Sequence, residues 1–298
     1  MSSRTDNRHR VATICREATG LAHHTCMRWA ADGLITRRRP VPDAADEQQW
    51  TFEALVVAEL ANGLRGHEQR DGALLGFTHA RPEPAGLTLS LHPAMADRVL
   101  GTLLPRIDQH QRGLRGVPGL RLVPMGGKWV LTRVQGRAAI HLVHPDADWR
   151  PALPQHGEGL TQLWRRNRHR MHPAEAADWE QRSGAGHGHD GVPAQNRLNS
   201  RLLRRPRLLG AAGAAHGSAH VYTHGGGDVV VEWCCSVERS DLERRLRRSG
   251  LAERPDGGPA RERERDRPWF PGEIAMGGGF VTLRRGPCHA ATAEAGVR

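Results

Sequence analysis

The chain has 298 residues, with 43 Lys and Arg against 32 Asp and Glu, so its formal net charge at pH 7 is +11. A chain of this length accommodates about two domains of ordinary size. The charge favours a polyanionic partner, because an arginine that neutralises a phosphate releases counterions. Arg, Ala, Gly and Pro dominate while Lys128 is the only lysine. This bias is typical of GC-rich genomes and weakens any argument from arginine content alone.

Neither a membrane-spanning nor a secreted protein is indicated. The sequence has no apolar run of about 18 residues, and its first residues, MSSRTDNRHR, contain no apolar signal-peptide core. The five cysteines are sparse and lack CxxC spacing, which is typical of reduced thiols. We therefore expect a cytoplasmic protein with no membrane partner.

The first 70 residues are expected to form a three-helix module. Residues 11–35 predict two short helices, and apolar periodicity predicts a third over 51–65. Thr51 is the expected N-cap of this third helix, and Gly66 is its expected stop.

Within this module, the sequence TGLAHHTCMRWAADGLI, residues 19–35, predicts a helix-turn-helix. Gly20 suits the turn because glycine adopts a positive φ without strain. The second helix would enter the major groove of DNA with its first residues facing the bases. The expected core is Ile14, Ala18, Leu21, Cys26, Trp29 and Leu34. The predicted DNA-binding residues are His23, His24, Thr25, Met27 and Arg28 on the helix, and Arg37, Arg38 and Arg39 in the following loop. The alternative interpretation is a plain helical hairpin.

The same segment resembles the N-terminal reading head of MerR-type regulators, in which a Thr-Gly-Val/Leu turn precedes a Thr-containing helix and a Gly-Leu-Ile/Leu ending. The matching residues are Thr19, Gly20, Leu21, Thr25, Trp29, Gly33, Leu34 and Ile35. The chain departs from the family at Cys26, Met27 and Ala30. It also lacks the Gly-Tyr-Arg-x-Tyr wing and a long dimerising helix. The resemblance covers less than a tenth of the chain, and it implies double-stranded DNA as partner. The larger α+β body would dimerise, bind a ligand or add phosphate contacts, so a homodimer is also expected.

The remainder predicts an α+β body, so the expected fold class is α+β with an N-terminal helix-turn-helix module. Residues 71–145 are expected to form one α+β domain, with a strand LTLSL, a helix from Pro93 and a hairpin KWVLTRV–RAAIHLV. Residues 146–195 should hold a helix, over 160–180, and a Gly-rich linker. Residues 196–298 should form a second α+β segment, with two hairpins, a helix SDLERRLRRSGL capped by Ser240, and a flexible charged C-terminal region.

Two segments, 72–104 and 208–251, each combine a small-residue Leu-Leu-Gly helix, strand material and a capped helix. This order is similar to LAGLIDADG modules, in which two helices pack closely and acids at their ends hold Mg²⁺ for DNA cleavage. Other residues stand in the matching zones: Thr78, His79, Ala80 and Arg81 in one, and Ala214, Ala215, His216 and Gly217 in the other. The resemblance thus implies a DNA-binding relic without cleavage.

Two arginine-rich stretches, WRRNRHR and RLLRRPR, are either phosphate contacts or solvated helix faces, and Trp164 could stack on a base. The first stretch contributes candidate phosphate contacts at Arg165, Arg166, Arg168 and Arg170. A zinc site from His216, His220 and Cys234 is a weak hypothesis, because their spacing matches no known ligand set. No GxSxG, P-loop, HExxH or strand-linked GxGxxG motif occurs, so no cofactor is expected.

Together these features favour a bacterial-type, sequence-specific DNA-binding protein, either a transcriptional regulator or a mobile-element protein. We favour a role without catalysis. The alternatives are a nucleic-acid-processing enzyme, such as a nuclease or recombinase related to LAGLIDADG modules, and a basic structural protein that binds nucleic acid without sequence preference.

Overall fold

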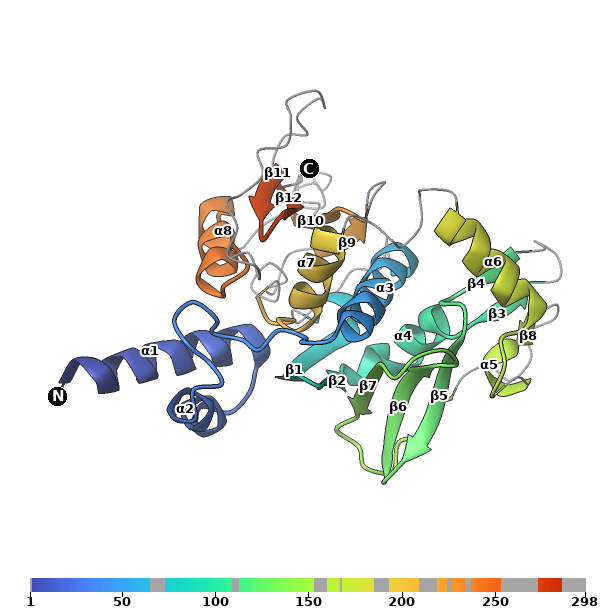
Figure 1. The fold of residues 1–298 in the computed structure, drawn as a ribbon, viewed down its shortest axis with the longest axis horizontal. Coiled ribbons are helices and arrows are strands. Elements are labelled where there is room, and N and C mark those ends of the chain that lie inside the picture. Colours follow the sequence, from blue (N-terminus) through green and yellow to red (C-terminus); the bar gives the residue numbers. More distant parts are fainter. Residues whose placement is uncertain are drawn as a thin grey trace, which may run out of the picture.

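The protein is an α+β protein, as its sequence predicts, and the described part contains three separate β-sheets (Figure 1). The computed structural model describes residues 2–64, 73–108, 113–152, 160–166, 168–184, 193–208, 219–223, 227–233, 237–252 and 273–285. None of the helices in these ranges is long and apolar enough to cross a lipid bilayer. The C-terminal region expected to be flexible, and most of the Gly-rich linker, lie outside them.

The first two helices, α1 (Ser2–Thr19) and α2 (His23–Ala31), form a pair that we call the head, residues 2–35. Helix α1 is longer than predicted, and residues 5–10 are exposed on all sides where it projects from the molecule (Figure 1). A small core separate from the main one holds the two helices together. Its buried members are Val11, Ala12, Cys15, Cys26, Trp29 and Ile35.

The predicted head core is confirmed in part. Cys26 and Trp29 are buried in it, and Leu21 and Leu34 pack against it as half-buried side chains. Ala18, however, belongs to the main core of the protein. The head is therefore attached to the body through the end of α1.

Helix α3 (Glu47–Gly63) lies at the centre of the body and is not part of the head. It begins four residues before the predicted Thr51, because the Asp46 carboxylate caps it by accepting from the backbone N–H groups of Gln48 and Gln49 at 2.8 and 3.2 Å. Eleven of its 17 residues are buried. A helix buried on nearly every side belongs inside a larger core, and α3 indeed packs against α7 (Pro193–Leu203).

The larger sheet has five strands in the order β1-β2-β7-β6-β5. Its strands are β1 (Phe77–Glu83), β2 (Gly86–Leu91), β5 (Leu120–Met125), β6 (Lys128–Arg133) and β7 (Ala139–Val143). The predicted strand LTLSL and the β6–β7 hairpin are confirmed, and β2 alternates buried Leu with half-buried Thr and Ser. Short 3₁₀ turns η1 (Leu74–Gly76) and η2 (Pro93–Met95) flank the first hairpin, and η2 leads into α4 (Ala96–Leu103).

The second sheet has four strands in the order β11-β12-β10-β9. Its elements are β9 (Ala219–Thr223), β10 (Val229–Trp233), β11 (Glu273–Met276), β12 (Gly279–Arg285) and the helix α8 (Arg239–Arg248). Both predicted hairpins are present. The predicted Ser240 cap is wrong, because α8 starts at Arg239 after Glu238 and has no side-chain cap hydrogen bond. Gly250, with φ of +87°, lies just past the end of α8.

The two sheets share one order of elements. In each, a central helix precedes a hairpin, a second helix follows, and a later hairpin returns so that its last strand pairs in parallel with the second strand of the first hairpin. The sequence predicts that a Leu-Leu-Gly helix begins each of the segments 72–104 and 208–251. In the structure the helices that begin the two units are instead α3 and α7. Residues 74–76 form a single 3₁₀ turn, and residues 209–218 lie outside the described ranges.

A third, three-stranded sheet lies at the end of the molecule away from the head (Figure 1). It consists of β3 (Arg106–Asp108), β4 (Gly113–Arg115) and β8 (Leu160–Gln162), with α5 (Leu163–Arg166) and α6 (Pro173–Gly184) beside it. The helix expected over 160–180 therefore begins as a strand. Arg121 of β5 and Glu175 of α6 form a buried ion pair at 2.9 Å, which joins this region to the large sheet.

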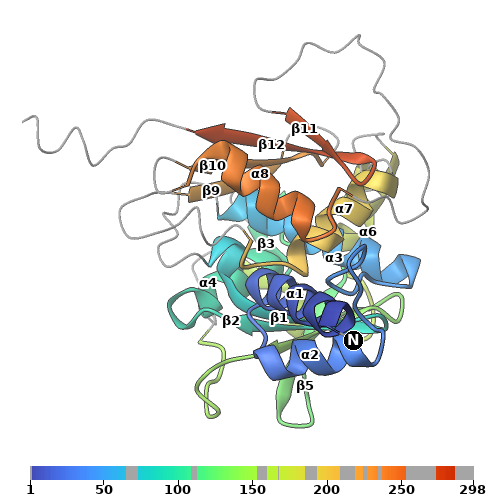
Figure 2. The ribbon, with the colours of Figure 1, turned by 90° about the vertical axis from the view of Figure 1, so that its left-hand side faces the viewer.

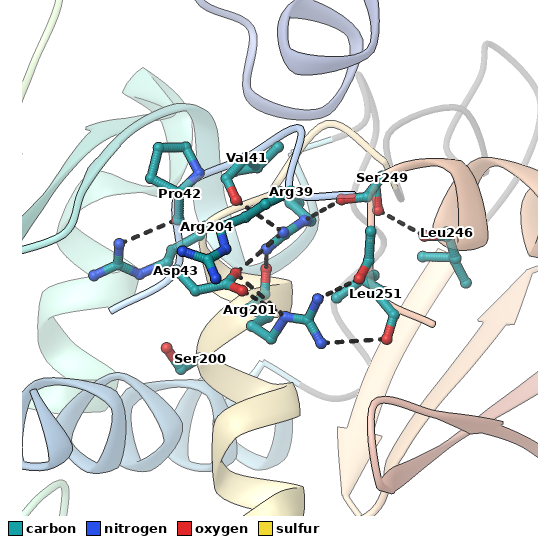
Figure 3. Close-up of polar contacts among 12 residues, drawn as sticks. Arg39, Val41, Pro42, Asp43, Ser200, Arg201, Arg204, Leu246, Ser249 and Leu251 are labelled. Carbon is teal, nitrogen blue, oxygen red and sulfur yellow. Dashed lines mark hydrogen bonds and ion pairs between the residues drawn. The ribbon is translucent and has the colours of Figure 1, made fainter. Parts of the chain in front are cut away.

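A buried arginine cluster joins the loop after the head to the rest of the body. Arg201, Arg204 and Arg205, at the end of α7, are each at most 4% exposed. The guanidinium groups of Arg201 and Arg205 pair with the Asp43 carboxylate, and that of Arg204 pairs with the Glu53 carboxylate. They also donate to backbone carbonyls of the loop and of the residues just after α8, and Figure 3 shows Arg201 between Asp43 and Leu251. Buried charges persist in proteins only when they are paired and hydrogen-bonded in this way.

Candidate nucleic-acid interface

Helix α2 presents a polar face to solvent. His24 and Arg28 are exposed and lie one helical turn apart, so their side chains share one side of the helix. Thr25 lies beside them and is half-buried. The opposite side carries the buried Cys26 and Trp29, which hold α2 against α1.

Two other residues predicted to bind DNA are less available. Met27 was expected to face outward but is half-buried against the head core. His23 is half-buried and stacks on His9 of α1, with ring centroids 5.8 Å apart. The exposed face of α2 is therefore narrower than predicted and centres on His24 and Arg28.

A tight turn after the head carries the three predicted arginines. The N–H of Thr36 donates to the carbonyl of Arg39 at 2.9 Å, and the N–H of Arg39 donates back to the carbonyl of Thr36 at 3.1 Å. These bonds close the turn over residues 36–39. Arg37, Arg38 and Arg39 are all exposed on it, as a phosphate contact requires.

The turn inside the head is seated on the large sheet. Gly20 has φ of +81°, and a Cβ added there would lie 2.3 Å from Cδ2 of His79 and 2.7 Å from Cδ of Arg207. The N–H of Arg207 also donates to the carbonyl of Ala18 at 3.1 Å. Burial and the nearby Arg207 lower the pKa of His79, which favours its neutral form in this contact. The head is thus docked at the β1 edge of the large sheet.

Helices α2 and α8 lie at the same end of the molecule, on either side of α1 (Figure 2). Helix α8 carries five exposed arginines that sequence analysis did not assign to a site: Arg239, Arg244, Arg245, Arg247 and Arg248. The available signal was the repeated Arg pairs of SDLERRLRRSGL, which we interpreted only as the polar side of a capped helix.

The other candidate phosphate contacts lie elsewhere. Arg165, Arg168 and Arg170 are exposed, but they belong to the region of α5 and α6 at the opposite end from α2 (Figure 1). The Arg165 guanidinium lies 4.8 Å above the ring of Trp164, so this indole face is already covered. The side chain of Arg166 lies outside the described residues. These arginines do not share a surface with the head.

The stretch RLLRRPR does not form a solvated phosphate-binding face. Arg201, Arg204 and Arg205 are buried and bound within the protein, and Arg207 alone of its four arginines is exposed. Both interpretations made from the sequence, phosphate contact and solvated helix face, are wrong for the three buried residues. Their ion-pair partners, Asp43 and Glu53, come from distant parts of the chain.

The zinc hypothesis finds no support in the described part of the chain. His216 and Cys234 lie outside it, and His220 is half-buried on β9 opposite Glu232 of β10. Over the described ranges, no group of three His, Cys, Asp or Glu side chains is placed to hold a metal ion.

Comparison of the chain with protein-family models, with curated proteins and with solved structures finds no match in any of the three. The geometry of the head and the charges around it are therefore the observations that bear on function.

Proposed function

We propose that this is a sequence-specific DNA-binding protein, a transcriptional regulator or mobile-element protein of bacterial type, that reads double-stranded DNA with α2. The observation that carries the proposal is the exposed pair His24 and Arg28 on the open side of a compact helix-turn-helix pair. A recognition helix needs this arrangement, with one side held by a supporting helix and the other free for the major groove.

The polar side of α2 and the turn 36–39 each have a role in this proposal. The Arg28 guanidinium donates to guanine O6 and N7 or grips a phosphate, and His24 and Thr25 hydrogen-bond the DNA backbone. The turn 36–39, which follows α2 in the chain, carries three more exposed guanidinium groups, and these bind phosphates. Residues 1–39 contain eight Arg against three acids, so the head and its turn attract DNA as a unit.

The test is capture of fragmented genomic DNA by the purified protein, with sequencing, at two salt concentrations. A sequence motif that survives the higher salt is expected, and a palindromic motif would further indicate a homodimer. On that motif, Arg28→Ala should weaken binding by about 1 to 3 kcal/mol, roughly 5- to 150-fold. Arg165→Ala, an exposed arginine at the far end, is the matched control and should bind like the parent.

Two results would count against this function. Salt-sensitive capture without a motif would indicate a basic protein that binds nucleic acid through charge alone. Equal binding of the motif by Arg28→Ala and the parent would show that α2 is not the reading helix.

A second proposal concerns the body, which we infer to be related to LAGLIDADG modules. It is supported by the repeated order of helix, hairpin, helix and hairpin, and by the packing of the two leading helices, α3 and α7, against each other. Incubation of the protein with supercoiled plasmid and Mg²⁺ or Mn²⁺ tests whether such a body cleaves DNA or only binds it. Metal-dependent nicking would favour a nucleic-acid-processing enzyme, and intact plasmid would favour a DNA-binding relic.

A further inference from the structure

The exposed arginines of α8 are not all neutralised on their own helix. Asp241 pairs with Arg244, and Glu243 pairs with Arg247 at 2.7 Å. Arg245 and Arg248 form no ion pair with any residue that the structure describes. Their spacing of three residues places them on the same side of α8, so this side offers two guanidinium groups to an external anion.

The end of α8 touches the arginine turn of residues 36–39. A Cβ added at Gly250 would lie 3.2 Å from the carbonyl oxygen of Arg38 and 2.9 Å from Cδ of Pro40. Two basic segments that are separated by about 200 residues in the sequence thus meet at one point. We call Arg37, Arg38, Arg39, Arg245 and Arg248 together the flank surface.

The buried cluster fixes the two parts of the flank surface relative to each other. Arg205 donates to the carbonyl of Ser249 at 3.1 Å and to the carbonyl of Val41 at 3.3 Å, so one side chain joins the end of α8 to the loop after the turn. Arg201 reaches the carbonyls of Gly250 and Leu251 in the same way. Groups fixed before binding lose less entropy when a partner arrives.

We propose that the flank surface binds the phosphates of double-stranded DNA next to the segment that α2 reads; this inference rests on the proposed function. DNA is the partner because α8 lies at the same end of the molecule as α2, with α1 between them (Figure 2), and because the end of α8 meets the basic turn 36–39 that follows α2 in the chain. A duplex held by α2 continues past the bases that α2 reads, and this continuation carries one negative charge per about 1.7 Å of the duplex axis. The flank surface supplies the complementary charge for this continuation.

The test compares two double variants on two duplexes that contain the recovered motif. Arg245→Ala with Arg248→Ala removes the α8 part of the flank surface. Arg98→Ala with Arg150→Ala removes the same charge from exposed positions at and near α4, since Ala152 is tied to Asp97 of that helix at 3.1 Å. One duplex has about 14 base pairs, little more than a helical turn, and the other about 30. Affinity is measured over a range of salt concentrations.

The expected result is specific to the α8 variant and to the long duplex. There the slope of log affinity against log salt should fall by about two, one for each lost phosphate contact. On the short duplex the α8 variant should have the same salt slope as the parent. The α4 control should have the same salt slope as the parent on both duplexes. Because all four positions are exposed, the melting temperature should stay the same and serve as the check on folding.

Two outcomes would overturn the inference. An unchanged slope on the long duplex would show that α8 does not contact DNA, and its arginines would then be free for another acidic partner. An equal loss on both duplexes would place them inside the site that α2 reads. Failure of the proposed function is seen separately, as equal binding of the short duplex by Arg28→Ala and the parent.

Discussion

Arg204 and Glu53 form an ion pair in which neither side chain is exposed to solvent, with Nη2–Oε1 and Nε–Oε2 distances of 2.6 and 2.7 Å. The carboxylate also accepts hydrogen bonds from Ser200 and Gln49. The guanidinium donates further to the backbone carbonyls of Pro42, Glu83 and Gly86. This fully bonded pair joins α3 to α7 at the centre of the body.

Glu53→Gln should destabilise the protein strongly, because it leaves the Arg204 guanidinium buried without a counter-charge. Breaking a buried pair from one side costs about 3 to 5 kcal/mol. The free energy of unfolding in urea measures the loss. Glu83→Gln is the control, since Glu83 pairs with Arg81 at 3.0 Å with both side chains about half exposed, and it should cost less than about 1 kcal/mol. Similar losses in the two variants would contradict this account.

Asp43 should make the stability of the protein depend on pH in the acid range. Burial alone would raise the pKa of Asp43. The nearby positive charges of Arg205 and Arg201 lower it by more, so the pKa of Asp43 lies below its usual value. A carboxylate of this kind stabilises the fold above its unfolded-state pKa of about 3.9, and this stabilisation is lost as the pH falls through the lower native value.

Asp43→Asn should therefore lower the unfolding free energy at pH 7 and flatten its decline below about pH 4. Unfolding in urea at a series of pH values from 7 to about 2 measures both effects. If parent and variant declined in parallel below pH 4, Asp43 would not be the group responsible.

Gly20→Ala should undo the docking of the head. The positive φ costs roughly 1 to 2 kcal/mol for any residue with a Cβ, and the new methyl group would also collide with His79 and Arg207. Gly33→Ala isolates the first effect, because Gly33 has φ of +75° and no described atom lies within 4 Å of an added Cβ. We expect Gly20→Ala to lose about 1 to 3 kcal/mol more stability than Gly33→Ala. Equal losses of unfolding free energy would show that His79 and Arg207 make room for the methyl group at no cost.

The two head cysteines should report opening of the head. Cys15 and Cys26 are both fully buried, and the hydrogen bond to Cys26 and burial raise the pKa of Cys15, which disfavours its reactive thiolate. Iodoacetamide should label Cys15 and Cys26 slowly in the native protein and fully in urea, as measured by peptide mass spectrometry. Gly20→Ala should label faster than the parent. Rapid labelling of the parent would mean that the head is open without any substitution.

Local signals were enough to predict the strand LTLSL, three of the hairpins and the turn of the head. The alternation in LTLSL and the glycines between apolar runs depend on neighbouring residues, and the structure has strands and turns there. Helix starts were harder. Asp46 captures the first N–H groups of α3 before the chain reaches Thr51, and both residues are acceptable caps in sequence terms.

The buried arginines could not be predicted in the same way. Arginine is almost never fully buried unless it is paired, and the partner of Arg204 lies 151 residues away at Glu53. The meeting of α8 with the turn 36–39 has the same origin, since it depends on how Gly250 packs on Pro40. The exposure of His24 and Arg28 could be predicted from the sequence, because the residues that bury the other side of α2 lie on α2 itself and on the adjacent α1.

The bonds between the loop at residues 41–43 and the segments 201–205 and 249–251 also have a consequence for the order of folding. During synthesis the head leaves the ribosome before the body, and the arginines and carbonyls that hold its loop are made about 160 to 210 residues later. Contacts so distant in sequence require closure of a long loop and form slowly. A nascent chain should therefore carry a formed head whose following loop, residues 41–43, stays unfixed until residue 251 has emerged.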